Sequence, residues 1–488
     1  MPDSFAPSTA ELVRFLPEII LTLVGTLVMV LAAVVKGRGQ RGLAYVSLAG
    51  LAAALAGVVV AYADPGTAFR DMLTIDGFAT FFRAVVIGVG ALTVLSSMEY
   101  LRREGAESGE YYALILYSVV GQCVMVAASD LIIIFIGLEI SSIASYVLAG
   151  YLRDRVRASE AAIKYFLLGS FATAFLLFGV AWLYGITGST YLSDIRAALV
   201  AQGPMSSPIL ISAAAALVFV GLAFKVSAWP FQSWAPDVYE GAPTPVAAFL
   251  SAGPKAAAFA VFLRVFIVAF GPIGTRWEPL LWVCALATMV VGNFAALLQT
   301  NVKRLLAYSS IAHAGYVLVA VTARSEIGTA AAMFYLAAYA LMNVGAFTVV
   351  AHVCRKGERF VEVKDLAGLG ARQPVTAALF SIFLLSLIGV PLTGGFFGKF
   401  YIFRAALHSD LIWLTVLGLL TSAVAAYYYL RVIVVMYMQE PAEATADLPP
   451  LGGALGASLW LSALGTLLLG IFPSLILDFA AKSALLAR

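Results

Sequence analysis

Hydrophobic residues run through almost the whole chain in long blocks that are separated by short polar segments. A helix needs about 20 mostly apolar residues to cross the hydrocarbon core of a bilayer, and scanning the chain for such runs predicts about 14 of them. The pattern therefore predicts an all-α, polytopic membrane protein. The predicted spans are residues 15–35, 43–62, 76–98, 111–129, 131–150, 161–186, 209–234, 245–270, 278–299, 303–323, 327–353, 375–404, 410–437 and 452–480.

Two of these spans are interrupted partway along. Span 209–234 contains Pro230, and span 375–404 contains Pro391 followed by a pair of glycines. Proline removes a backbone hydrogen bond, and the freed carbonyl groups are tolerated at membrane depth only against protein or a water-filled cavity. Paired interruptions of this kind indicate an inverted-repeat transporter that binds its ion where the helices break.

The charged loops predict how the helices are oriented. With an outer N-terminus, basic residues gather in every second loop, whereas the other loops carry scattered single charges. This asymmetry predicts that both termini lie on the outer face. The first residues are acidic, which is not typical of a signal peptide. The basic residues assigned to the inner face are Lys36, Arg38, Arg41, Arg102, Arg103, Arg153, Arg155, Arg157, Lys303, Arg304, Arg355, Lys356, Arg359, Lys364 and Arg372.

Composition supports the same class. Of the 488 residues, 62% are hydrophobic and 12% are charged, whereas a soluble domain carries about 25% charged residues. The net charge of +3 is small and the basic residues are dispersed, which gives no support to nucleic-acid binding. Cys123, Cys284 and Cys354 lie in apolar stretches without the spacing of metal ligands, so we expect no haem, zinc or iron–sulfur site in this chain.

Several ionisable residues lie inside the apolar spans. A charge near the bilayer centre costs about 2.5–3.5 kcal/mol on the insertion scale, so each such residue needs a physical reason. Arg83 and Arg264 also lie within spans, and the sequence assigns them no role. The candidates for a functional role are Glu139, Lys164, Lys225, Lys255, His313 and Lys399.

Glu139 and Lys225 are two of these six candidates. Ser142 and Tyr146 share the helical face of Glu139, which predicts a polar stripe turned away from lipid. We favour a carboxyl group in a polar channel, and the alternative is a salt bridge between helices. Lys225 precedes Pro230 by five residues, so the broken helix supplies carbonyl groups and water beside a titratable amine. The alternative is that Lys225 extends its amine to the membrane surface.

Three more candidates, Lys255, His313 and Lys399, lie further along the chain. Lys255 is almost central in its span and has small neighbours, so its partner must come from another helix or from water. His313 is again central, and a structural role and a functional role fit the sequence equally. Lys399 follows the second break. A buried lysine can lose its proton near neutral pH, and a movable carboxylate can restore the charge. The five residues together therefore predict a row that carries protons along the membrane.

Glu160 and Lys164 form an i,i+4 pair with the acid first, the favourable order on a helix. This pair either stabilises the inner end of its helix or tunes Glu139 and Lys225. Asp237 lies in the loop after the first broken span. We expect it to be solvated, to cap a helix or to meet a partner subunit.

Five segments of the chain resemble one protein family. They are KVSAWPFQSWAPDVYEGAPTPV (225–246), EAAIKYFLLGSF (160–171), AGPKAAAFAVFLR (252–264), NVKRLLAYSSIAHAGY (301–316) and GVPLTGGFFGKFYIF (389–403). They resemble the antiporter-like, proton-channel membrane subunits of respiratory complex I, the bacterial NADH–quinone oxidoreductase. The resemblance extends over residues 70–440.

The resemblance implies a fold and a set of functional residues. It implies one membrane domain, residues 1–488, built from two inverted five-helix repeats. These are residues 110–270 with broken helix 209–234 and residues 278–437 with broken helix 375–404, flanked by peripheral helices at 1–100 and 452–480. Glu139, Lys225, Lys255 and Lys399 match the proton-channel residues of the family, and His313 matches a histidine on its central axis.

The resemblance also implies partners and a location. It implies no cofactor in this chain, whereas NADH, FMN, iron–sulfur clusters and quinone bind in or at partner subunits. The partners would be the other membrane and peripheral subunits, including neighbouring antiporter-like ones, in the lipid bilayer of a bacterial inner membrane. The chain itself would carry out no redox chemistry, although it would belong to an enzyme.

One departure and two alternatives remain. The family has histidine where this chain has Gln232, and an amide cannot carry a proton charge. The first alternative is a subunit of a multisubunit Na⁺/H⁺ antiporter of the Mrp type, which shares the fold. The wording VYEGAPTPV at 238–246 favours the complex I reading. The second, a scaffold whose charges are structural pairs, is disfavoured because three buried lysines face one central glutamate.

Overall fold

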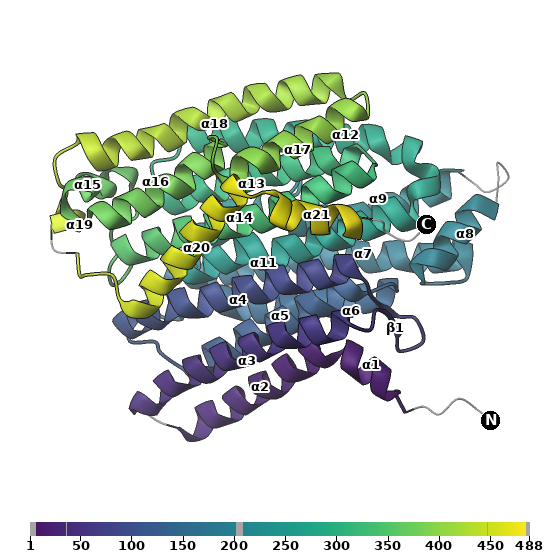
Figure 1. Cartoon of the computed structure of the whole chain (residues 1–488), viewed down its shortest axis with the longest axis horizontal. Helices are drawn as coiled ribbons and strands as arrows, with labels where there is room; N and C mark the ends of the chain where they lie inside the picture. Colours follow the sequence, from purple (N-terminus) through teal and green to yellow (C-terminus); the bar gives the residue numbers. More distant parts are fainter. Residues whose placement is uncertain (1–5, 36, 202–207, 447, 485–488) are drawn as a thin grey trace.

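Long helices fill the computed structural model, which describes residues 6–35, 37–201, 208–446 and 448–484 (Figure 1). Within these residues, 13 helices are long and apolar enough to cross a membrane. The broken span formed by α16 (Pro374–Ile388) and α17 (Gly394–His408) adds one more crossing. The prediction of about 14 spans is therefore confirmed.

The long helices are α2 (Leu16–Val34), α3 (Gln40–Tyr62), α4 (Gly77–Glu104), α5 (Gly109–Ala127), α6 (Leu131–Ala149), α7 (Val156–Thr187), α9 (Pro208–Val226), α11 (Thr244–Leu263), α12 (Gly274–Leu297), α13 (Val302–Thr322), α14 (Glu326–Val353), α18 (Ile412–Met438) and α20 (Gly453–Ile471). A π-helical segment, Arg264–Ala269, continues α11. The shorter elements are α1 (Thr9–Arg14), α8 (Leu192–Ala201), α10 (Trp234–Gly241), α15 (Leu369–Arg372), α19 (Glu443–Ala446), α21 (Ser474–Ser483) and the antiparallel hairpin of β1 (Gly66–Ala68) and β2 (Leu73–Ile75).

Polar side chains set where several of the long helices begin. The carboxylate of Asp76 accepts a hydrogen bond from the backbone N–H of Ala79 at the start of α4, at 2.7 Å. Asp130, Asn301 and Ser325 cap α6, α13 and α14 in the same way. Such caps satisfy N–H groups that have no partner within the helix, so they fix the helix ends at the edges of the apolar blocks.

Both predicted helix breaks are present. The first broken span ends as α9 at Val226, and the chain turns through residues 227–233 before α10 begins. The second span ends as α16, where Gly389 adopts a positive φ of 94°, and resumes as α17 after residue 393. Gly389 can take this left-handed conformation because it has no β-carbon. The inverted relation between the two repeats stays a prediction.

One predicted span and three smaller elements differ from the sequence analysis. The span 452–480 is not one helix: it divides at Phe472 and Pro473 into α20 and α21. Proline cannot donate the backbone hydrogen bond that would continue α20, which explains the division. The hairpin, α8 and α10 are elements that the hydropathy pattern did not predict, because each is too short to form an apolar block.

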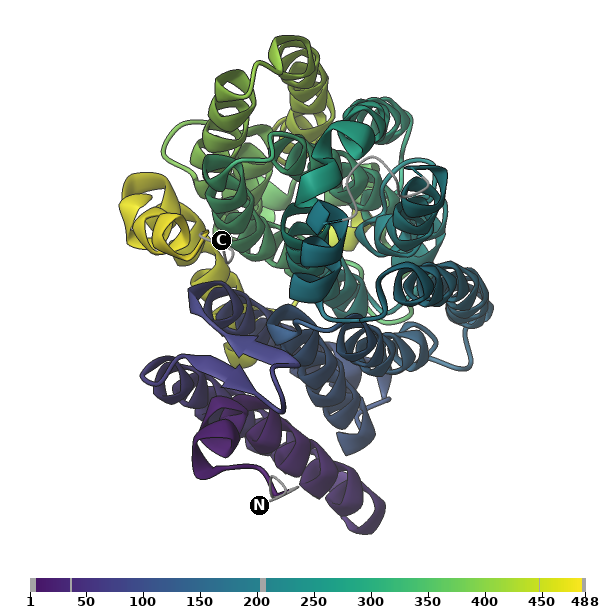
Figure 2. The same ribbon diagram turned by 90° about the vertical axis from the view of Figure 1, so that its right-hand side faces the viewer.

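The central helices are buried and the outer helices expose apolar side chains. In α11, α13 and α14, 94% of the most apolar stretch is buried inside the protein, and these helices lie in the middle of the bundle in Figure 1. By contrast, Leu23 on α2, Phe171 on α7 and Trp413 on α18 are more than half exposed. Exposed apolar side chains on the outer surface are expected of helices that face lipid. Figure 2 views the helices nearly end-on and shows the purple N-terminal helices at the lower edge of the bundle.

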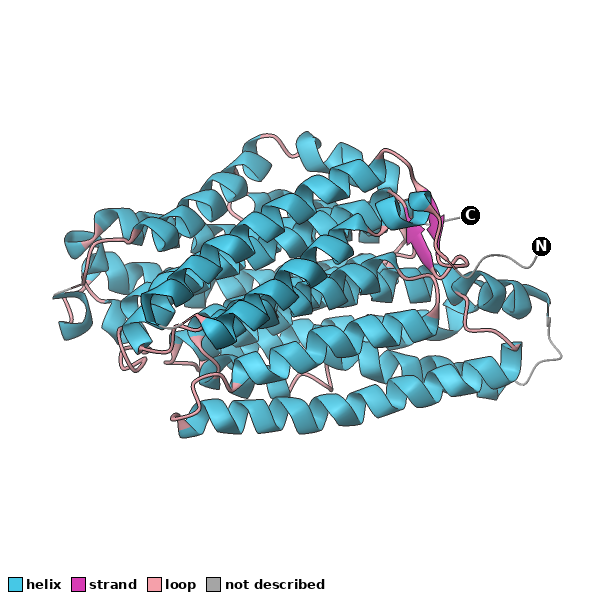
Figure 3. Ribbon diagram, turned by 90° about the horizontal axis from the view of Figure 1, so that it is seen from below, coloured by secondary structure: helices cyan, strands magenta, loops and turns pink. Residues whose placement is uncertain are grey.

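The two ends of the bundle differ in what they contain. The hairpin and α1 lie at one end, and α21 leads toward the same end (Figures 1 and 3). Arg14 of α1 pairs there with Asp64 at 3.1 Å, and the ring of Phe479 on α21 contacts Tyr62. Basic loops gather at the opposite end, among them the predicted inner-face residue Arg155. Lys36, another predicted inner-face residue, lies outside the described residues.

Candidate functional site

Lys225 lies at the first break, one residue before α9 ends. Its ammonium Nζ donates hydrogen bonds to Ser142 Oγ at 2.7 Å and to Tyr146 OH at 3.3 Å, both on α6. The rings of Tyr146, Tyr165 and Phe224 surround the ammonium at 5.2–5.8 Å, a range in which cation–π attraction operates. The polar stripe predicted on α6 is therefore present, and it receives Lys225.

Glu139 lies one turn before Ser142 on the same helix. Its Oε1 atom is buried and has no hydrogen-bond partner. Among the described residues, no cation lies within the 4.0 Å of an ion pair to it. The alternative of a helix–helix salt bridge at Glu139 is therefore wrong in this structure. The carboxyl group lies on the face of α6 that also carries Ser142 and Tyr146.

Lys255 lies near the middle of α11 and is 2% exposed. Its Nζ donates to the backbone carbonyl of Ser310 at 3.0 Å and to the Ser310 hydroxyl at 2.5 Å. The partner therefore comes from another helix, α13, as predicted. Both acceptors are neutral, so the ammonium charge is not balanced by a carboxylate.

His313 lies on α13, one turn beyond Ser310, inside a cage of hydroxyl groups. Its Nδ1 forms a hydrogen bond with Tyr335 OH, and its Nε2 lies 3.2 Å from Tyr429 OH. The ring of Tyr339 lies 5.2 Å away between centroids. The sequence analysis missed these tyrosines. The four-residue spacing of Tyr335 and Tyr339 on α14 was the available signal, since residues so spaced share a helical face.

Lys399 lies on α17, just after the second break. Its Nζ donates to the carbonyls of Leu387 and Ile388 at 3.0 and 2.9 Å, and to Ser422 Oγ at 2.8 Å. The last carbonyls of a helix receive no hydrogen bond from a backbone N–H within that helix. The break therefore leaves these carbonyls available as partners of Lys399. The ammonium also lies 4.8 Å from the centre of the Tyr316 ring.

Helix α13 joins the last three members of the row. Ser310, His313 and Tyr316 follow one another at three-residue spacing, which places them along one face. The strip begins under Lys255 and ends under Lys399. Among the described residues, no hydrogen bond joins Lys225 directly to Lys255. One face of α13 thus carries polar residues from Lys255 to Lys399, and Lys225 lies at a separate site at the first break.

A charged network lies beside the first break and overturns one expectation. Asp237 is not a solvated loop residue: it lies in α10 and accepts from Lys164 and from Arg304, each at 2.8 Å. Lys164 also pairs with Glu160 at 2.7 Å, and Arg304 with Glu240 at 2.9 Å. Burial raises the pKa of Asp237, but the hydrogen bonds from Lys164 and Arg304 outweigh it and hold that pKa below its usual range.

The remaining predicted residues mark the breaks themselves. Pro230 and Pro391 are both exposed, each in the turn of its break. Gln232 is half-buried, and its side-chain oxygen Oε1 has no hydrogen-bond partner among the described groups. An unpaired buried amide oxygen is costly unless water reaches it. This environment suits an internal water near the first break.

The two arginines without a role in the sequence each form an ion pair with a carboxylate. Arg83 contacts Glu18 at 2.7 Å, and neither side chain is more than 1% exposed. Arg264 binds both carboxylate oxygens of Asp76, at 2.8 and 3.0 Å. These pairs join helices that are far apart in the sequence, so they tie the bundle together. The sequence analysis did not identify Glu18 as an ion-pair residue, because its partner is 65 positions away.

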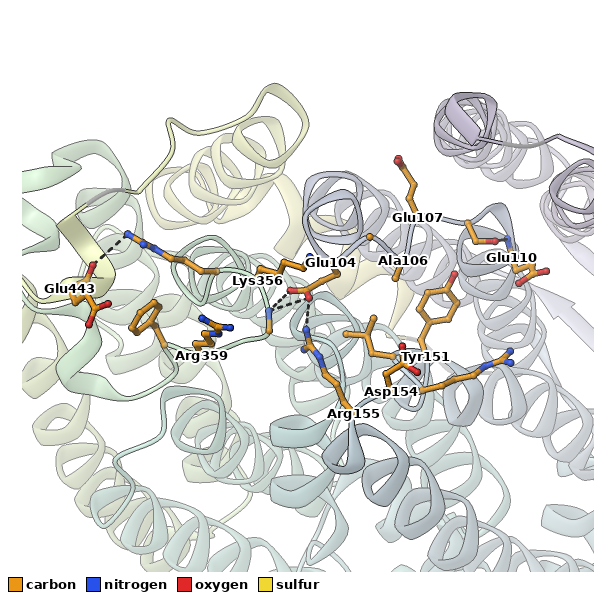
Figure 4. Close-up of a pocket in the computed structure, with 17 residues that line it drawn as sticks. Glu104, Ala106, Glu107, Glu110, Tyr151, Asp154, Arg155, Lys356, Arg359 and Glu443 are labelled. Atoms are coloured by element: carbon orange, nitrogen blue, oxygen red, sulfur yellow. Dashed lines mark hydrogen bonds and ion pairs between the residues drawn. The ribbon is translucent and has the colours of Figure 1, made fainter.

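A pocket of about 960 Å³ lies at the basic-loop end and is shown in Figure 4. Glu104 occupies its centre, where it pairs with Arg155 and accepts from the backbone N–H of Gly357 at 3.1 Å. Both acidic and basic side chains line this pocket, and no member of the predicted row does. Among the described residues, no three His, Cys, Asp or Glu side chains are placed to share a metal ion.

Glu358 is a second charged residue that the sequence analysis missed. It accepts from Lys303 Nζ at 2.8 Å, from the Thr244 hydroxyl at 2.5 Å and from Tyr100 OH at 2.6 Å. These partners belong to α13, α11 and α4, so one loop carboxylate joins three helices. Burial raises the pKa of Glu358, but the charge of Lys303 and these hydrogen bonds outweigh it and lower that pKa below its ordinary value.

We expect Glu358→Gln to lower the free energy of unfolding by about 3 kcal/mol, because it leaves the buried Lys303 ammonium without its counter-charge. The pKa of Glu358 is lower in the folded state than in the unfolded state. The contribution of Glu358 is therefore fully present above the pKa of an unfolded glutamate and is lost as the pH falls through the folded-state value.

Thermal unfolding in detergent at neutral pH, compared between the native protein and Glu358→Gln, measures this effect. Glu362→Gln is the matched control, since Glu362 lies in the same loop and forms no ion pair among the described residues. Equal unfolding temperatures for the native protein and Glu358→Gln would contradict the assignment.

Comparison with known proteins gives three consistent findings. The family described as "NADH:quinone oxidoreductase/Mrp antiporter, TM" matches residues 128–425. A curated relative from Solibacter usitatus (strain Ellin6076), "NADH-quinone oxidoreductase subunit N 1", is 64% identical over 99% of both chains. A chain of respiratory complex I from Thermus thermophilus superposes with a TM-score of 0.81 at 34% identity, over 95% of this chain and 99% of that one.

A chain of the Mrp complex from Dietzia sp. DQ12-45-1b superposes equally well. Its TM-score is 0.84, over 98% of this chain and 97% of that one, but only 21% of the residues are identical. This likeness shows a shared fold and nothing finer. The fold alone therefore does not separate a redox-driven pump from an antiporter.

Proposed function

Because the chain belongs to the family of membrane subunits found in NADH:quinone oxidoreductases and Mrp antiporters, we propose that it is the proton-translocating subunit N of a bacterial complex I. Membership confirms the resemblance of the five sequence segments. The observation that carries the proposal is the row itself. Lys255 and Lys399 are buried and Lys225 is half-buried, and each donates to carbonyl or hydroxyl oxygens instead of a carboxylate.

The protonation of lysines held in this way responds strongly to nearby charge. A unit charge at about 10 Å, with an effective dielectric constant of about 20, changes the free energy of protonation by about 1.7 kcal/mol. That corresponds to more than about a tenfold change in the ratio of charged to neutral amine. When one member of the row gains or loses a proton, its neighbours are therefore pushed toward the opposite change.

In the proposed mechanism, quinone reduction in partner subunits changes the charge at one end of the row. Glu139 and Lys225 exchange a proton at the first break, where Ser142 and Tyr146 hold the amine. Lys255, His313 and Lys399 pass the change along α13 through the Ser310 hydroxyl and the tyrosine cage. Glu160 and Lys164, with Asp237, form the charged entrance beside the first break. Gln232 contributes through ordered water instead of its own charge.

The proposal includes partners, cofactors and orientation. NADH, FMN, iron–sulfur clusters and quinone would bind in or at partner subunits, among which neighbouring antiporter-like subunits lie against this chain in the bilayer. The chain sits in the inner membrane with both termini on the outer face. The gathering of basic loops at the end opposite α1 supports this orientation.

Purification in mild detergent tests the proposal against the Mrp alternative. Mass spectrometry of the copurifying proteins and an NADH-oxidation assay are made on the same fraction. We expect partners that carry flavin and iron–sulfur clusters, and NADH oxidation that depends on quinone. A set of small membrane proteins without cofactors would contradict the proposal and make this chain an antiporter component.

A further inference from the structure

The last long helix, α20, lies across the bundle and ends against the second break. In Figure 1 it runs diagonally, in yellow, over the central helices. Its buried face carries Ser458, Ser462, Thr466 and Gly470 at four-residue spacing. Small residues on one face allow close helix–helix approach inside a membrane. The hydroxyl of Ser458 donates to the carbonyl of Leu92 on α4 at 3.1 Å, which fixes the far end of the helix.

The contact at the near end is backbone against backbone. A β-carbon added at Gly470 would overlap the main chain of Leu392 and Thr393, the last residues of the second break. The preceding residue, Leu469, packs beside Gly394, with its Cβ 3.1 Å from where a β-carbon on Gly394 would lie. The position of α20 therefore limits where the break can lie.

Leu392 shows why the break needs such a limit. Its φ is +70°, a conformation that residues with a β-carbon rarely adopt, yet its side chain is 68% exposed and contributes little packing. A strained residue persists only when its surroundings impose the conformation. The backbone contact from Gly470 is the feature of α20 that opposes relaxation of Leu392.

The break in turn sets the partners of Lys399. The carbonyls of Leu387 and Ile388, which accept from the Lys399 ammonium, directly precede it. The Lys399 side chain also runs past Gly389, whose added β-carbon would lie 3.2 Å from its Cδ. A movement of the break changes the distance from the ammonium to these carbonyls.

We propose that Gly470 is a positioning residue for proton transfer at Lys399, acting through the backbone of the second break. The proposal makes α20 a brace that holds α4 and the break at a fixed separation. It rests on the role of Lys399 proposed above. The division of the C-terminal span into α20 and α21 then has a function, because α20 must end beside Leu392 and Thr393 of the break.

The test measures protons translocated per NADH oxidised by the assembled complex in proteoliposomes. We expect Gly470→Ala to lower this ratio at least about twofold, because small displacements of reacting groups have large kinetic effects. The amount of assembled complex is measured in parallel. Gly456→Ala is the matched control on the same helix, since its β-carbon would meet only Leu451, at 3.9 Å. A native ratio in Gly470→Ala would overturn the proposal.

A double-mutant cycle with Lys399→Met separates positioning from general stability. If Gly470 acts through Lys399, adding Gly470→Ala to Lys399→Met lowers the ratio no further. An equal proportional loss in both backgrounds would overturn the proposal. Should Gly470→Ala prevent assembly, Gly394→Ala tests the same contact from the side of the break, since its β-carbon would lie 3.1 Å from Leu469 Cβ and would press the break away from α20. A native ratio in this second variant would also overturn the proposal. A native ratio in Lys399→Met alone would instead refute the role of Lys399 itself.

Discussion

Lys255→Ala is expected to slow proton transfer through this chain by about 10²-fold, the effect of removing a positioned proton-transfer group. Lys255 is buried at the centre of α11, and its amine is held by Ser310 alone. Without the amine, the polar strip on α13 loses its first titratable member. NADH oxidation is expected to fall too, but by less than pumping, so that fewer protons are moved per NADH oxidised, whereas assembly of the complex is retained. Proton uptake by proteoliposomes containing the purified complex measures the effect.

Lys255→Met is the matched control for the volume of the side chain. It fills the space that alanine leaves empty, so a cavity does not contribute to its effect. Both variants are expected to lose pumping equally. Wild-type pumping in either variant, normalised to the amount of assembled complex, would show that the row does not operate through its centre.

Glu139→Gln is expected to cause a loss of similar size, about 10²-fold in proton transfer. The amide keeps the shape of the carboxyl group but cannot take up a proton. Glu139 shares a face of α6 with Ser142 and Tyr146, which hold Lys225, and one of its oxygens is buried without a partner. The initial rate of proton uptake, measured after NADH addition, reports the loss.

Glu139→Asp provides the comparison, because it keeps the carboxyl group and shortens its reach by one methylene. We expect it to retain more pumping than Glu139→Gln. If the two variants pump equally well, the carboxyl group is not a proton carrier, and Glu139 has a structural role in α6.

The sequence predicted the features that depend on local chemistry. Pro230 and Pro391 located both helix breaks, because proline acts on the backbone of its own segment. The polar stripe of Glu139, Ser142 and Tyr146 followed from helical spacing alone. Lys255 was correctly expected to find its partner on another helix. In each case the evidence lay within one turn or one span.

The features that the sequence did not predict depend on packing between distant segments. The cage around His313 uses Tyr335 and Tyr429, which come from two other helices. Asp237 looked solvated because its cations lie 73 and 67 positions away. Glu358 and Glu18 were missed for the same reason. Periodicity gives the face of a helix, but it does not identify the helix that covers that face.

The ratio of protons translocated to NADH oxidised by the Lys255→Arg complex tests the central claim most directly. Arginine keeps a buried positive charge and its hydrogen-bond donors, but it does not release its proton at accessible pH. If Lys255 is a proton carrier, the arginine complex assembles and its ratio falls as far as that of Lys255→Ala. If Lys255 only braces α11 against α13 with a fixed charge, the arginine complex pumps at the native ratio, and that result would contradict the account.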